Sequence, residues 1–300
     1  MVSGNGTTID NRKLRDSSSK LIFGDNILSS QFFRDYGDVE ILRNIRPEDV
    51  EDVSERYIPL YSTERESDTV KKVNITKYVH PEEGKNPLNI PLYIISLVEH
   101  KTKVEYNVIM QILRYMIHIW ENYEKDMERE CPGISRKKGF LYPPVLPIVY
   151  YEGTDQWTAP QCLEDRILCG ELLGSYLPHF SYQLVRLHDY SNEELLAHKD
   201  EISLAMLWNK IQTMADVDDF IQLPDDRVSD MLDKTPKYLV DTLTKLLRAL
   251  MYHMNVPEEK AERAIAKVKE QKMGQLWENA HIDICEYMVA NAAIMAEERA

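Results

Sequence analysis

Three consecutive polar residues end the most apolar stretch of the sequence. The run PLYIISLV, residues 91–98, leads directly into Glu99, His100 and Lys101. Alternate side chains of a strand share a face, so Glu99 and Lys101 point to one side and His100 to the other. A carboxylate and an ammonium at the C-terminal end of a strand lie where open parallel sheets bind ligands. Taken alone, such an ExK tripeptide is more often a surface ion pair at a strand end than a site.

A second carboxylate, Asp68, opens a strand that is expected to pair nearby. If it adjoins Glu99, the two carboxylates converge as hard oxygen ligands, which suit Mg²⁺. Glu66 lies two residues before Asp68, would face the same side and could compete for the same role. The residue types therefore predict a divalent-cation site, with Mg²⁺ as the expected ion.

The periodicity of apolar residues predicts the elements that would position these side chains. It indicates one or two helices over residues 21–45 and a long amphipathic helix over residues 105–130. Residues 90–101 and 145–151 are apolar on both faces, as in the middle of a covered sheet. A strand, a helix and a strand of these lengths make a right-handed crossover with parallel strands. Further strands are expected at residues 56–62, 67–75 and 182–190.

These patterns divide the chain into three parts. Residues 1–20 are polar and read as a disordered leader without the apolar stretch of a secretory signal. Residues 21–190 form an α/β core, and residues 191–300 form a helical C-terminal region.

The order helix, three strands, helix, strand, with an acid on the second strand and ExK on the third, resembles the core of the PD-(D/E)xK nuclease superfamily. The resemblance implies a mixed sheet flanked by helices, followed in this chain by the all-α region. It also implies that Asp68 and Glu99 bind a divalent metal, helped by the backbone carbonyl of His100. Lys101 would then orient or activate the attacking water.

Three segments carry a more specific resemblance: ERESDTVKKV, YIISLVEHKTKVEYNVIMQILRYMIHIWE and YPPVLPIVYYEGTDQWTAP, in that order. They are similar to the recombination-promoting nuclease family, also called YhgA-like putative transposases, over roughly residues 20–190. The resemblance implies a Mg²⁺-dependent endonuclease of double-stranded DNA, linked to recombination or mobile-element biology. A three-acid transposase core would instead place its first acid in the middle of an early strand, an arrangement that the pattern lacks.

Gln111 and Tyr115 lie four residues apart on the expected long helix and so share a face. They match the QxxxY element of some members of the nuclease superfamily, where it lines the active site. The resemblance therefore implies a supporting role for both. From the residues alone, a core tyrosine and a capping amide are an equal alternative.

The sequence departs from the superfamily pattern in two respects. Asp68 and Glu99 are 31 positions apart, so residues 77–89 must form an insertion between adjacent strands. Many relatives also carry an acid on the first helix, and Asp35, Asp38 and Glu40 all qualify here.

The charge is spread unevenly over a chain with a net charge of -14. Residues 1–150 hold 21 Lys and Arg against 23 Asp and Glu; the totals of 36 and 50 leave 15 against 27 for residues 151–300. The nearly neutral first half permits DNA binding, with Lys71, Lys103 and Arg114 as candidate contacts. The basic segment SRKK at 135–138 could also contact phosphates, and a solvated loop explains it equally well.

The acidic helical region offers a surface for a protein partner or for homo-oligomerisation. An alternative function follows: a nuclease-like protein with weak or no activity that serves as a partner-binding module. No apolar run approaches the ~20 residues of a membrane span, and the four cysteines show no metal-ligand spacing. We therefore expect a cytoplasmic protein without membrane contact, and the family resemblance implies a bacterial one.

Overall fold

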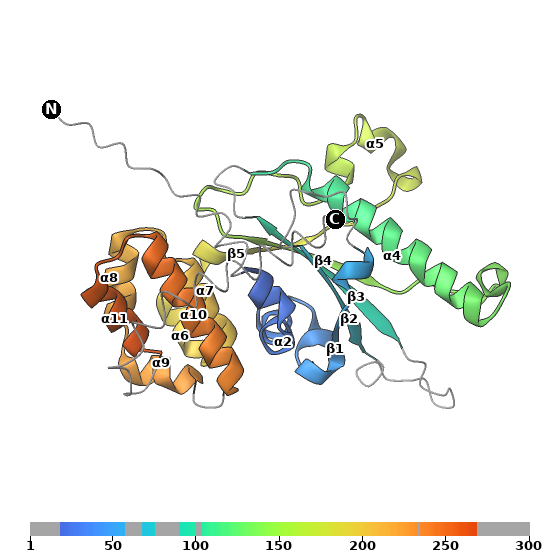
Figure 1. The fold of residues 1–300 in the computed structure, drawn as a ribbon. Coiled ribbons are helices and arrows are strands. Elements are labelled where there is room, and N and C mark those ends of the chain that lie inside the picture. The colour runs from blue at the N-terminus through green and yellow to red at the C-terminus, as the bar shows by residue number, and fades with distance from the viewer. Residues whose placement is uncertain (1–18, 58–67, 76–89, 100–103, 233–234, 269–300) are drawn as a thin grey trace, which may run out of the picture. The chain divides into compact units, whose positions relative to one another are not determined.

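A mixed five-stranded sheet organises the first part of the computed structural model, which describes residues 19–57, 68–75, 90–99, 104–232 and 235–268 (Figure 1). The strands lie side by side in their order along the chain, β1-β2-β3-β4-β5. The pairs β1/β2 and β2/β3 are antiparallel, whereas β3/β4 and β4/β5 are parallel. The strands are Val50–Asp52, Thr69–Asn74, Pro91–Glu99, Val145–Tyr151 and Gln183–Arg186.

The described residues form two compact units, residues 19–192 and residues 193–268. The first unit holds the whole sheet, and every regular element of the second is a helix. The chain is therefore a mixed α/β protein with an additional set of helices.

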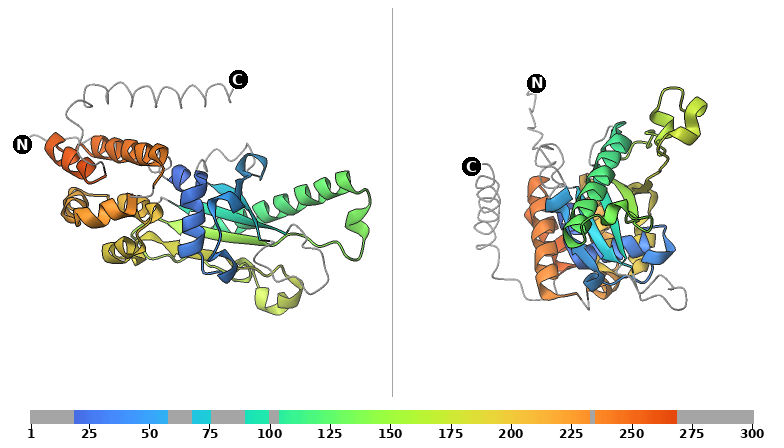
Figure 2. Two further views of the ribbon diagram at one scale, coloured as in Figure 1. Left: turned by 90° about the horizontal axis from the view of Figure 1, so that it is seen from below. Right: turned by 90° about the vertical axis from the view of Figure 1, so that its right-hand side faces the viewer.

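The helix α4, Val108–Glu130, connects β3 to β4 and covers one face of the sheet (Figures 1 and 2). The parallel pairing of β3 and β4 confirms the parallel strands expected from the sequence. The apolar face of α4 meets alternate residues of the strands, among them Tyr93, Ile95 and Leu97 of β3. The side chains of β3 from Leu92 to Val98 are all buried, as the apolar run predicts.

The helix α2, Asn26–Asp35, packs on the opposite face of the sheet. The rings of Phe23 and Phe32 both contact Tyr150 of β4, at centroid distances of 5.7 and 5.6 Å. Tyr151, the next residue along β4, instead joins the core under α4. Both faces of the central strands are thus covered.

The first strand does not lie where the sequence pattern placed it. Residues 56–62 were expected to be extended, but Arg56 and Tyr57 belong to the short helix α3, Ser54–Tyr57. The strand is β1, immediately before it. The carboxylate of Asp52 accepts hydrogen bonds from the N–H and the hydroxyl of Ser54, at 2.9 and 2.6 Å, and this local turn ends the strand and starts the helix. Residues 58–62 lie outside the described residues.

The helices of the second unit are separated by short breaks. The helical pattern after Ser191 is broken at Lys199, which has a positive φ of 55°, and at Asp200, whose side chain caps the next helix through the Ser203 N–H. The helices are α6 Asn192–His198, α7 Glu201–Asn209, α8 Met214–Gln222, α9 Asp225–Leu232, α10 Lys237–His253 and α11 Glu258–Ala266.

The remaining elements are short. Residues 19–24 are helical, whereas residues 1–18 of the predicted leader lie outside the described residues. Ser19 is buried and its hydroxyl donates to the buried carboxylate of Glu152 at 3.0 Å. The short helix α5 is Gly170–Leu173, and the 3-10 turns are Glu40–Leu42, Pro47–Asp49, Ile134–Arg136, Glu164–Arg166, Gly174–Tyr176 and Leu187–Asp189. Within the described parts of the chain, no helix is long and apolar enough to cross a membrane.

Candidate active site

A buried carboxylate, Asp68, lies immediately before β2 on the α4 side of the sheet. Its side chain is 7% exposed. One of its oxygens, Oδ2, accepts hydrogen bonds from Nε2 of Gln111 at 2.6 Å and from the hydroxyl of Tyr115 at 3.0 Å. Two donors on one carboxylate oxygen fix the orientation of the group in the core.

The geometry of α4 brings these two donors to the same point. Gln111 and Tyr115 are separated by four residues, so they stand one above the other on one face of the helix. Both are buried, at 2% and 3% exposure, among the apolar residues that hold α4 against the sheet. The structure therefore brings the pair Gln111 and Tyr115, which the sequence pattern singled out together, to Asp68.

Glu99, the last residue of β3, lies opposite Tyr151 of β4 in the parallel register. On the other side of β3, Thr69 pairs with Ser96. Extending this register by one residue puts Asp68 beside Leu97, so Glu99 occupies the next position diagonally along β3. Diagonal neighbours on adjacent strands are about 7–8 Å apart. The backbone thus places Glu99 one diagonal position from Asp68 on the neighbouring strand.

Several predicted residues lie outside the described part of the structure. These are Glu66, His100, Lys101 and Lys103, and for Glu99 only the backbone is described. Their predicted roles remain predictions. Arg114 is exposed on α4, three residues after Gln111, which is compatible with its predicted contact to a phosphate.

Lys71 does not fit its predicted role in nucleic-acid binding. Its side chain is fully buried on the α2 side, where its ammonium donates to Asp52 Oδ2 at 2.9 Å and to the Gly24 carbonyl at 2.8 Å. Burial lowers the pKa of Lys71, and the hydrogen bond to Asp52 opposes that shift. The ammonium is enclosed, so a phosphate cannot reach it.

Asp52 and Ser54 are partners in this network that the sequence pattern missed. The Ser54 hydroxyl accepts from the Val70 N–H at 2.9 Å and so ties the start of α3 to β2, two residues after Asp68. Burial alone would raise the pKa of Asp52, but hydrogen bonds from Ser54 and from Lys71 bring that pKa below its ordinary value. The spacing Asp-x-Ser is the signal that could have revealed the turn.

The acids near the first helix are not brought to Asp68. Asp35 ends α2 and forms an ion pair with Arg34, while Asp38 and Glu40 are exposed beyond it. They belong to the α2 side of the sheet, whereas Gln111 and Tyr115 hold Asp68 from the α4 side.

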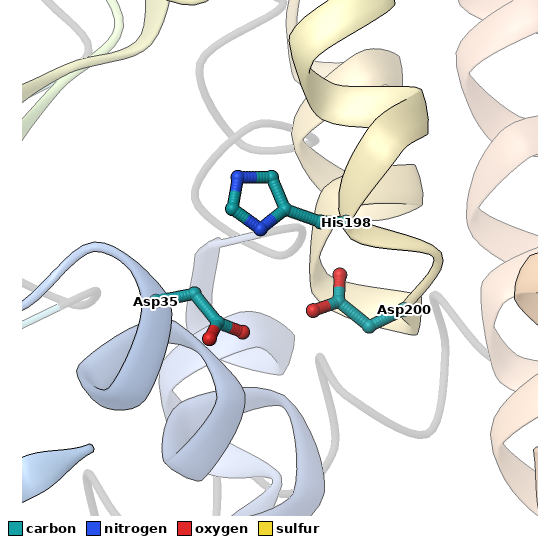
Figure 3. A group of neighbouring side chains, drawn as sticks. All are labelled: Asp35, His198 and Asp200. Atoms are coloured by element: carbon teal, nitrogen blue, oxygen red, sulfur yellow. The ribbon is translucent and has the colours of Figure 1, made fainter.

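Figure 3 draws Asp35 together with two residues of the helical unit, His198 and Asp200. His198 ends α6, and Asp200 caps α7 with its Oδ1, which accepts from the Ser203 N–H and hydroxyl. We assign no metal site to these residues, because Asp35 belongs to one compact unit and the other two belong to the other.

The sheet and the group at Asp68 define a class: a mixed α/β protein with a buried carboxylate held by a helix at the junction of its antiparallel and parallel halves. A family model described as "Putative transposase, YhgA-like" matches residues 28–237, more than two thirds of the chain. The chain therefore belongs to the YhgA-like putative transposase family, as its sequence resemblance implied. No curated protein and no solved structure matches it.

Proposed function

We propose that this protein is a Mg²⁺-dependent endonuclease that hydrolyses phosphodiester bonds of double-stranded DNA. The observation that carries the proposal is the hydrogen-bonded group of Asp68, Gln111 and Tyr115, one strand away from the end of β3. Family membership supports a role in recombination or mobile-element biology, because the family is named for transposases.

The order of elements supports a PD-(D/E)xK-like core. The helix α2 precedes β1, β2 and β3, and α4 then leads to β4. The acid lies at the start of the second strand and Glu99 at the end of the third, and these two strands are neighbours. This is the arrangement that the superfamily resemblance requires.

The residues present suit a divalent cation. Asp68 and Glu99 would supply carboxylate oxygens and His100 a carbonyl oxygen, a set of hard ligands that fits Mg²⁺. Gln111 and Tyr115 donate to one carboxylate oxygen of Asp68 and so keep the group from rotating. The bound cation would lower the pKa of a water molecule and offset the charge of the scissile phosphate.

Lys101 is proposed to supply a positive charge to the same phosphate. It follows Glu99 by two residues, so strand periodicity would direct both to one face if the strand continued that far. A point charge in a site partly closed to water stabilises the charge that develops during hydrolysis.

The test is nicking or linearisation of supercoiled plasmid during a titration of Mg²⁺. Replacing Asp68 by asparagine keeps the shape of the side chain and removes its charge. We expect Asp68→Asn and Glu99→Gln each to lower the cleavage rate by at least about a hundredfold, because loss of a metal ligand removes several kcal/mol of transition-state stabilisation.

The matched control is Asp155→Asn, which removes the same charge from an exposed position of the α/β unit. It should cut at the parental rate. An Asp68→Asn protein that is folded and cuts as fast as the parent would overturn the proposal. A parent protein that cuts no DNA at any Mg²⁺ concentration would also overturn the proposal.

A further inference from the structure

The far end of α4 carries a cluster of positive charge in an otherwise acidic chain. Between residues 129 and 138 there are four basic residues and one acid, Glu130, whereas the whole chain has a net charge of -14. We call the four basic residues the basic tip: Arg129, Arg136, Lys137 and Lys138. All four are exposed.

The turn that presents the basic tip has a fixed shape. The carboxylate of Glu128 accepts three hydrogen bonds, from the Gly133 N–H at 2.6 Å, the Ser135 N–H at 2.8 Å and the Ser135 hydroxyl at 2.6 Å. Gly133 has a φ of 82°, which favours glycine. Arg136, Lys137 and Lys138 follow this turn directly and are exposed.

The acids near the tip already have partners within the protein. Glu128 serves the turn, Glu124 accepts the hydroxyl of Tyr142, and Asp126 forms ion pairs with Arg56 and Arg129. Three negative charges of this part of α4 are thus engaged by neighbouring groups, while Arg136, Lys137 and Lys138 are exposed to solvent.

A line of polar residues joins the tip to the candidate active site. It consists of positions spaced alternately by four and three residues along α4, which lie on one flank of a helix: Gln111, Tyr115, His118, Asn122, Lys125 and Arg129. The line begins at the two residues that hold Asp68, where it is buried, and becomes exposed toward Lys125 and Arg129. Figures 1 and 2 show this end of α4 and its turn extending beyond the strands.

The length of the line matches a short stretch of duplex. Arg129 is fourteen residues after Tyr115, so it lies about 21 Å farther along the helix axis. A DNA duplex advances 3.4 Å per base pair, so this distance corresponds to about six base pairs. A duplex that had a phosphate at Asp68 could therefore reach the basic tip.

We infer that the exposed part of this line and the basic tip form a surface that binds the phosphate backbone of duplex DNA, about six base pairs from the candidate active site. The inference rests on the proposed function, since it takes DNA to be the ligand. It explains how an acidic protein holds a polyanion: the positive charge is local and raised on the end of a helix.

The test measures binding separately from cleavage. The full chain carrying Asp68→Asn is titrated in a metal-free buffer with EDTA against a fluorescent duplex of about twenty base pairs, and anisotropy is followed at several salt concentrations. The tip variant adds Arg136→Gln, Lys137→Gln and Lys138→Gln. Each phosphate contact contributes about 0.9 to the slope of log Kd against log salt concentration. We expect the tip variant to bind at least about tenfold more weakly and to lose about two to three from that slope.

A second variant and a control locate the effect. Lys125→Gln with Arg129→Gln should lower the slope by about two, if both residues contact phosphates. The control removes two lysines and one arginine, as the tip variant does, but from exposed positions of the helical unit: Lys237→Gln, Lys245→Gln and Arg263→Gln. It should keep the parental slope of log Kd against log salt concentration. Circular dichroism verifies that each variant is folded.

The outcomes separate this inference from the proposed nuclease activity. A tip variant with parental affinity and slope overturns the inference, because the basic tip is then only a solvated turn. A control variant that loses as much affinity and slope as the tip variant also overturns it. A parent that binds no duplex at low salt overturns it as well. If the tip variant loses binding while the wild-type protein cuts no plasmid with Mg²⁺, the binding surface stands and the endonuclease proposal fails.

Discussion

Two charged side chains three residues apart at β2 are buried on opposite faces of the sheet. Asp68 lies on the α4 side, 7% exposed, and accepts hydrogen bonds from Gln111 and Tyr115. Lys71 lies on the α2 side, 0% exposed, and its ammonium donates to Asp52 and to the Gly24 carbonyl. The strand β2 and the residue before it thus bury one acid and one base, each beneath a different helix.

The hydrogen-bond partners of Lys71 and of Asp68 are of different kinds. Lys71 meets an opposite charge, so its partner offsets the cost of burying the ammonium and ties β2 to β1 and to the turn before α2. The amide of Gln111 and the hydroxyl of Tyr115 orient the carboxylate of Asp68 from α4. An oriented carboxylate is suited to serve as a hard ligand for a cation. The comparison thus assigns a structural role to Lys71, and the proposed function assigns a catalytic role to Asp68.

The largest effect expected from this comparison is on the free energy of unfolding. Lys71→Met keeps the length of the side chain and leaves Asp52 without its ammonium. Breaking a fully buried ion pair costs about 3–5 kcal/mol, but the Asp52 side chain is 42% exposed, so we expect a loss of about 2 kcal/mol in urea unfolding. The cleavage rate at a temperature where the variant is folded should stay near that of the parent.

The adjacent residue supplies a matched control for Lys71. Lys72 also pairs with an acid of β1, Glu51, at 3.0 Å, but both side chains are exposed, at 37% and 63%. Lys72→Met should change the unfolding free energy by less than about 1 kcal/mol. Equal losses of unfolding free energy in Lys71→Met and Lys72→Met would contradict a special structural role for Lys71. A Lys71→Met protein of parental stability that no longer cuts DNA would contradict it as well.

A smaller effect is expected from the donors of Asp68. Tyr115→Phe removes one hydroxyl and leaves Gln111 as the second donor. Losing one partner that orients a metal ligand typically lowers activity by about 10–100-fold, so we expect a fall of roughly tenfold in the Mg²⁺-dependent cleavage rate. The unfolding free energy should fall by no more than about 1–2 kcal/mol.

The same helix offers a control for Tyr115. Tyr123 lies two turns farther along α4 and contacts the ring of Phe140. Tyr123→Phe removes a hydroxyl of the same type at a distance from Asp68 and should leave cleavage unchanged. If Tyr115→Phe loses stability but keeps the parental Mg²⁺ dependence and rate, the hydrogen bond to Asp68 serves the fold alone.

The sequence predicted the α4 side of the sheet better than the α2 side. The apolar run before Glu99 and the amphipathic pattern after Glu105 each specify one element, and the spacing of Gln111 and Tyr115 places both on one face of a helix. The pattern could not tell what that face meets, because the approach of Asp68 depends on the pairing of β2 with β3.

The prediction for Lys71 failed because burial is a property of packing. Lysine is rarely fully buried, and nothing in the local sequence shows that α2 covers the face of the strand to which Lys71 points. The first strand was misplaced for a related reason. β1 has only three residues, two of them acidic, so it lacks an apolar pattern, and its pairing with β2 is what defines it.

The smallest expected effect is on the pH dependence of stability and comes from Glu128, at the far end of α4. Glu128, like Asp68, accepts more than one hydrogen bond, but it lies in an exposed turn. Hydrogen bonds from the Ser135 hydroxyl, and then from the Gly133 and Ser135 N–H groups, lower the pKa of Glu128 from 4.5 to about 2. The folded protein therefore binds this proton less readily than the unfolded chain does.

The sign of the pH effect follows from that difference. A carboxyl with a lowered pKa in the folded state stabilises the fold above its ordinary pKa and loses this contribution as the pH falls toward the folded value. The melting temperature of Glu128→Gln should thus lie slightly below that of the parent at pH 7, with the difference closing between about pH 4.5 and pH 2. Glu121→Gln, an exposed substitution on the same helix, should show no such closing. A difference for Glu128→Gln that is constant with pH would mean that the hydrogen bonds of the turn do not favour the ionised form of Glu128.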